Sequence, residues 1–273
     1  VSDQNNAASM KGTQGGVVGG FGGRKYGPDD PLKLQQIEII RSRLAGEAQK
    51  PAAAGKATKA EVGEMVAALA VTPVTKELGI GVMQIYSFGT VTLHAYNTRD
   101  ALGDECFVLE TADNLVTLES PAFHANLEEL TAYIESLNKP VFASIVAYHP
   151  NGAGYLADGA VYATEAAKIE ITEGSVKGLI DGFIVTFGDA FDGSIPEITN
   201  VLDTKSVTIG GIEFIANAAG DIEIPAINSV YTHMLGADVH SIMAGTDHMD
   251  AMIATLQGYK DSGYELILSS HYT

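Results

Sequence analysis

The residues of this chain that could do chemistry are its seven histidines, His94, His124, His149, His233, His240, His248 and His271. A hydrolytic zinc site needs three His, Asp or Cys ligands and an open position, where the pKa of a bound water falls to about 7. Nucleophilic catalysis has little support, because Gly-x-Ser-x-Gly is absent and the single cysteine, Cys106, lies in an apolar run typical of a buried, inert thiol. Acidic pairs such as Glu128 with Glu129 are typical of a solvated surface.

One histidine lies in a motif-like segment, residues 139–154, which reads KPVFASIVAYHPNGAG. This segment resembles the first metal-binding strand and loop of the metallo-β-lactamase superfamily, whose members carry His-x-His-x-Asp-His before a glycine-rich turn. Placing Pro150 on the usual proline of that motif puts Ala147, His149, Asn151 and Gly152 on its four ligand positions. Only His149 keeps a metal-binding side chain, so the resemblance implies a degraded motif.

The resemblance covers roughly residues 80–273 and is one of element order and hydrophobic pattern. Strands at 106–110 and 115–119, a helix and the motif loop follow the order of the first half of that fold. The second half is matched by a strand and helix start at 160–166, a hairpin at 207–214, and strands at 227–233 and 266–271. The implied fold is α/β (α+β), a metallo-β-lactamase-like αββα sandwich.

The same resemblance implies a ligand set at the ends of adjacent strands. His149 takes a first-motif position, His233 lies where a bridging Asp is usual, and His271 takes the final ligand position, with Asp238 or His240 as further candidates. Zinc is the cofactor that this set would hold. The alternative is that the histidines are remnants that hydrogen-bond neighbouring groups in a closed cleft, with no cofactor.

Other expectations concern the elements outside these motifs. Residues 1–57 form a glycine-rich basic arm with an amphipathic helix and a linker, and residues 58–70 form a helix that leads into a domain spanning residues 58–273. The patterns further predict a hairpin at 82–96, helices at 126–138 and 247–262, and strands at 141–146, 180–187, 208–216 and 226–232.

Charge is unevenly distributed along the chain, whose net charge is −18. Residues 1–60 carry nine basic and five acidic groups, a net of +4, whereas the rest carries seven and 29, a net of −22. An acidic body disfavours binding to nucleic acid and suits a secreted or periplasmic protein. The start at Val-Ser-Asp fits either a chain processed by signal cleavage or an arbitrary boundary of the sequence. No apolar run reaches the roughly 18 residues that a membrane span requires.

These features support three hypotheses about function. The first is a secreted metallo-β-lactamase-like protein that has lost hydrolase activity and self-assembles, head to tail or as a filament, through residues 1–57. The alternative is an atypical metal-dependent hydrolase of esters, lactones or amides that uses His149, His233 and His271. A third is a protein that binds a small ligand in the same cleft without chemistry.

Overall fold

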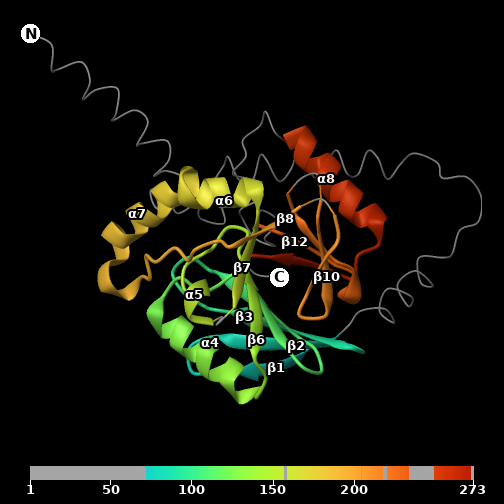
Figure 1. Cartoon of the computed structure of the whole chain (residues 1–273), viewed down its shortest axis with the longest axis horizontal. Helices are drawn as coiled ribbons and strands as arrows, with labels where there is room; N and C mark the ends of the chain where they lie inside the picture. The colour runs from blue at the N-terminus through green and yellow to red at the C-terminus, as the bar shows by residue number, and fades with distance from the viewer. Residues whose placement is uncertain (1–71, 157–158, 204, 218–219, 234–248, 272–273) are drawn as a thin grey trace, which may run out of the picture. The chain divides into compact units, whose positions relative to one another are not determined.

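The computed structural model describes residues 72–156, 159–203, 205–217, 220–233 and 249–271 (Figure 1). The chain divides into two compact units, one of residues 57–240 with 262–273 and one of residues 1–56 with 241–261. The predicted arm at 1–57, the lead-in helix at 58–70, Asp238 and His240 lie outside the described residues.

Within the described residues, the first sheet has eight strands that lie side by side in chain order. They are β1 (Val74–Glu77), β2 (Val82–Phe88), β3 (Val91–Asn97), β4 (Glu105–Glu110), β5 (Leu115–Leu118), β6 (Val141–Ile145), β7 (Ala160–Thr164) and β8 (Asn200–Leu202). Strands β1 to β5 are antiparallel, and β5 to β8 are parallel. The change of direction follows α4, since a parallel pair needs a crossover connection.

In the part of the chain that the structure describes, the second sheet has five strands in the order β13-β12-β11-β10-β9. They are β9 (Val207–Ile209), β10 (Ile212–Ala216), β11 (Ile222–Ile224), β12 (Ser229–Thr232) and β13 (Leu266–Ser269). Gly210 and Gly211 join β9 to β10 with φ of 57° and 88°, a two-residue turn that needs positive φ at both positions. Strands β12 and β13 are parallel, which brings their carboxyl ends to one edge.

The main core lies between the two sheets. Side chains at alternate positions of β3, β4 and β5, such as Leu93, Phe107 and Leu118, share one buried cluster with Phe214 and Tyr231 of the second sheet. The rings of Phe107 and Tyr231 meet edge to face, with centroids 6.2 Å apart. The predicted mixed α/β class with two sheets is therefore confirmed.

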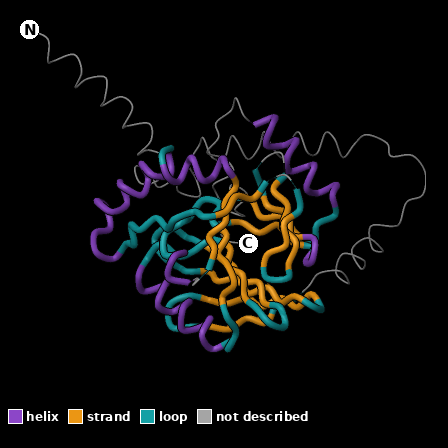
Figure 2. Tube along the Cα trace, in the orientation of Figure 1, coloured by secondary structure: helices purple, strands orange, loops and turns teal. Residues whose placement is uncertain are grey.

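Helices cover the other face of the first sheet. Helix α4 (His124–Ser136) packs Leu127 and Leu130 on Met83 and Cys106, so the cysteine is buried as predicted. The remaining helical elements are α5 (Ala153–Leu156), α6 (Glu165–Thr172), α7 (Ser175–Phe187), η1 (Gly188–Ala190), η2 (Pro225–Ile227) and α8 (Met249–Ser262) (Figure 2). Among the described helices, none combines the length and the apolarity needed to cross a membrane.

The predicted strand at 180–187 is wrong, because this segment is the second half of α7. Its run Phe-Ile-Val-Thr-Phe is typical of a strand, but Val176, Ile180, Phe183 and Phe187 follow helical spacing and pack in one cluster with β7. The predicted strand at 208–216 is two strands, β9 and β10, because the chain turns at Gly210 and Gly211, as the hairpin at 207–214 had implied. The other predicted elements within the described residues are present, with ends shifted by at most three residues.

Candidate metal centre

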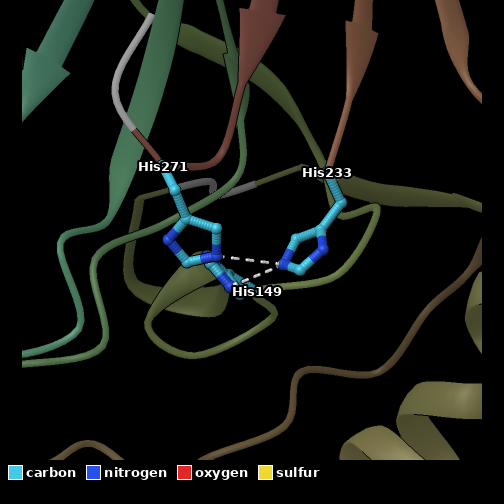
Figure 3. A group of neighbouring side chains, drawn as sticks. All are labelled: His149, His233 and His271. Atoms are coloured by element: carbon cyan, nitrogen blue, oxygen red, sulfur yellow. Dashed lines mark hydrogen bonds between the residues drawn. The ribbon is translucent and has the colours of Figure 1, made fainter. Parts of the chain in front are cut away.

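Three histidines from separate segments converge at one edge of the larger unit. His149 lies in the loop between β6 and α5, His233 directly follows β12, and His271 follows β13. Strand β4 begins at this edge, where the Glu105 N–H donates to the carbonyl of Ser270 at 2.6 Å. Figure 3 shows the three imidazole rings pointing toward one another.

The geometry of this histidine triad suits a cation. The Nε2 atom of His233 lies 3.3 Å from Nε2 of His149 and 3.3 Å from Nε2 of His271. One ligand atom from each residue lies within 4.8 Å of the others. Nitrogens bound about 2.0–2.1 Å from a tetrahedral zinc ion lie about 3.3–3.4 Å apart, so the two shorter separations match such a site.

Hydrogen bonding alone satisfies this arrangement less well. A neutral imidazole carries a single N–H, so a proton on His233 Nε2 can be donated fully to only one of its two neighbours. A cation would accept all three lone pairs together. Burial lowers the pKa of His149, which favours the neutral form that binds metals.

A buried carboxylate faces the outer side of two of these rings. Oδ1 of Asp104 lies 3.8 Å from Nδ1 of His149 and 3.4 Å from Nδ1 of His271. Asp104 is only 1% exposed, and neither of its carboxylate oxygens has a hydrogen bond from the residues that the structure describes. Burial, and to a lesser extent the charge of Asp100, holds the pKa of Asp104 well above its usual range.

A second buried carboxylate, Glu119, fixes the backbone of the His149 loop. Its Oε1 accepts the N–H of Ala147 at 2.5 Å and of Tyr148 at 2.9 Å, and its Oε2 accepts the N–H of His149. Glu119 directly follows β5 with φ of 61°, a left-handed conformation that turns the chain at this edge. The Tyr148 ring stacks on His233, with centroids 3.6 Å apart.

The other motif positions have structural roles. Ala147 supplies a backbone N–H to Glu119, and the buried Asn151 donates through Nδ2 to the carbonyl of Asp192 at 2.6 Å. Gly152 has φ of 73°, and a Cβ there would lie 3.0 Å from the methyls of Leu127. Within the described part of the chain, the group of side chains that could bind a metal ion is the histidine triad.

The structure thus brings together the three predicted ligands, whereas the metal-binding role itself stays a prediction. His94 and His124 lie elsewhere, on β3 and at the start of α4, and His248 lies outside the described residues. Sequence reasoning missed Asp104 and Glu119. In the structure, Asp104 directly precedes β4 and Glu119 directly follows β5, but such a position does not by itself distinguish them from other acidic residues.

Comparisons with known proteins gave structural similarity alone. No family model matches the sequence, and no curated protein matches it. Similar solved structures include the DIM-1 metallo-β-lactamase exposed to ceftazidime, with 14% identity, a TM-score of 0.44, and coverage of 72% of this chain and 92% of that chain. A metallo-β-lactamase from Erythrobacter litoralis has 15% identity and a TM-score of 0.47, and the match covers 72% of this chain and 92% of that chain.

A HARLDQ-motif mutant of a metallo-β-lactamase from Cronobacter sakazakii gives 12% identity, a TM-score of 0.41, and coverage of 74% of this chain and 80% of that chain. All three are metallo-β-lactamases, the family that the sequence resembles. At such identities, the chemistry has to be argued from the residues of this chain.

Proposed function

We propose that this protein is a metal-dependent hydrolase of the metallo-β-lactamase type, with one zinc ion held by His149, His233 and His271. The observation that supports the proposal is the convergence of three imidazoles, in which two of the Nε2–Nε2 separations are those of a tetrahedral site. Three neutral imidazoles form a donor set that suits zinc and leaves a fourth position open.

Zinc in a three-histidine site supplies a hydrolytic nucleophile near neutral pH, since it lowers the pKa of a water ligand to about 7. The chain's own residues hold and orient the ligands. Glu119 fixes the backbone at His149 through three N–H groups, and Tyr148 restricts the His233 ring by stacking on it. Both contacts reduce the motion that metal binding would otherwise have to restrict.

A single metal ion is favoured over a pair. The side chains at the other motif positions, Ala147, Asn151 and Gly152, provide no further imidazole or carboxylate, and Asn151 is committed to Asp192. The substrates that the family resemblance suggests are esters, lactones or amides. Self-assembly through the arm at residues 1–57 stays a prediction from the sequence, because this arm lies outside the described residues. Loss of activity and secretion also stay predictions from the sequence.

The test is metal binding followed by hydrolysis. Metal-free protein titrated with Zn²⁺ is expected to bind about one ion per chain and then to hydrolyse members of a panel of generic esters and lactones. Removing a residue that only hydrogen-bonds a metal ligand costs about 10–100-fold in metal affinity. His233→Gln removes a ligand itself, so we expect it to weaken zinc binding by more than about 100-fold.

The matched control is His94→Gln, which replaces a buried histidine on another face of the sheet, where both ring nitrogens already have partners. This variant should bind zinc as the wild type does. The proposal is wrong if the wild type binds no stoichiometric metal, or if His233→Gln and wild type bind equally.

A further inference from the structure

The least satisfied group beside the triad is the Asp104 side chain. Its backbone is well held, because its carbonyl accepts the N–H of Thr98 at 3.1 Å and the hydroxyl of Thr98 at 2.8 Å. Asp100 Oδ1 ties the same loop by accepting the N–H groups of Leu102 and Gly103 at 2.9 and 2.8 Å. The Asp104 carboxylate takes no part in these bonds, so the loop does not depend on it.

A buried carboxylate without hydrogen bonds lowers the stability of the folded protein, and such groups are rare in folded proteins unless they have a function. The groups that Oδ1 of Asp104 faces are Nδ1 of His271 at 3.4 Å and Nδ1 of His149 at 3.8 Å. Nδ1 of His149 also lies 3.8 Å from Oε2 of Glu119, an oxygen that already accepts the His149 N–H. Both separations from Asp104 exceed a normal hydrogen bond by less than 1 Å. A small rotation of each ring would bring its Nδ1 within hydrogen-bonding distance of Asp104.

We propose that Asp104 is a positioning residue that orients two ligand histidines at once by accepting both Nδ1–H groups. A histidine that donates Nδ1–H to a carboxylate presents the bare lone pair of Nε2 to the metal, so the carboxylate selects the ligating tautomer. His149 and His271 come from different sheets, and a shared acceptor keeps their Nε2 atoms at a fixed separation. The inference rests on the proposed metal site.

Two independent features support this role. The Glu105 N–H bond to the Ser270 carbonyl, 2.6 Å long, anchors the residue next to Asp104 against the segment that leads into His271. When a divalent cation is bound, the ionised form of Asp104 would also offset its charge, which three neutral imidazoles leave uncompensated. Asp104 would therefore affect both the orientation of the ligands and the charge of the site.

The experiment titrates metal-free protein with Co²⁺ and follows visible absorption, a readout that does not depend on activity. Asp104→Asn keeps the size of the side chain, loses the charge and places an amide N–H₂ toward the rings. We expect its Co²⁺ affinity to fall about 10–100-fold with a changed absorption spectrum. The thermal midpoint of the metal-free variant should equal or exceed that of the wild type, because the side chain that is replaced is buried and has no hydrogen bond from the described residues.

The control Glu110→Gln changes a carboxylate that contacts the Nε2 of His94, outside the triad, and should keep wild-type Co²⁺ affinity. If Asp104→Asn binds Co²⁺ as wild type does, the inference is overturned while the metal site stands. It is also overturned if the metal-free variant unfolds at lower temperature, since this would show a structural role. Absence of Co²⁺ binding by the wild type would instead reject the proposed function, and the inference with it.

Discussion

Among the residues that the structure describes, two groups combine a buried histidine with a carboxylate, and they are built differently. In the first, on the helix-covered face of the first sheet, His94 Nδ1 lies 2.8 Å from the Tyr133 hydroxyl and His94 Nε2 lies 2.8 Å from Glu110. Lys139 pairs with the same carboxylate at 2.7 Å. Every ring nitrogen and every charge of this His94 network has a partner.

The triad is arranged differently in two respects. Its Nε2 atoms face one another, and the nearby carboxylate of Asp104 has no hydrogen bond from the described residues. Similar residue types therefore give a satisfied structural network in one place and converging lone pairs in the other. The difference teaches that unmet bonding capacity, rather than the presence of buried histidine, indicates a site.

The largest expected effect that tests this comparison is on stability without metal. His94→Ala removes two hydrogen bonds and leaves the buried Tyr133 hydroxyl and the Glu110 carboxylate without their histidine, so we expect a loss of about 3 kcal/mol. His149→Ala should cost clearly less, because it removes one of three lone pairs that compete for the same space. Urea unfolding of both chelator-treated variants measures the difference. Equal losses would contradict the distinction between the two groups.

The next effect concerns Glu119, which accepts three backbone N–H groups. Glu119→Gln turns an amide N–H₂ toward one of these donors, so we expect a stability loss of about 2 kcal/mol and weaker zinc binding through displacement of His149. The control Glu129→Gln alters a carboxylate that accepts the N–H groups of Ile80 and Gly81 at 2.6 and 2.7 Å. It should lose similar stability and keep zinc affinity. Calorimetric titration with zinc separates the two variants.

Much of the fold could be predicted because local patterns agree with tertiary packing. Alternating apolar residues and the Gly89 turn predict the β2–β3 hairpin, and 3.6-residue spacing predicts α4. The failure in α7 arose because a short apolar run of β-branched and aromatic residues has the same composition in a strand as in a packed helix. Only the cluster with β7 decides between them.

The site was predictable only in part. His149, His233 and His271 were all predicted from the family resemblance, His149 from the motif loop and the other two from the strands that carry ligands in that family. Asp104 could not be selected among 34 acidic residues, because its role depends on two contacts distant in sequence. Those contacts arise from strand pairing and from the Glu105 to Ser270 bond, neither of which leaves a local signal.

The smallest expected effect is a pH dependence that belongs to the His94 network. Burial lowers the pKa of His94, and this effect outweighs the hydrogen bond and charge of Glu110, which raise the pKa. The charge of Lys139 lowers the pKa of His94 further. Tyr133 contacts the same ring through a neutral hydroxyl. A histidine whose folded pKa lies below its unfolded value of about 6.5 contributes stability above that pH, and this stability is lost as pH falls through the folded pKa.

Urea midpoints of the metal-free wild type should therefore decrease from pH 7.5 to pH 5.5, values chosen to bracket the unfolded pKa. The decrease should be shallower in His94→Gln, whereas contributions from Asp104, Glu119 and the triad are common to both proteins and cancel in the comparison. A steeper decrease in the variant would show that His94 is held in its charged form, as an ion pair with Glu110 rather than as the neutral member of a satisfied network.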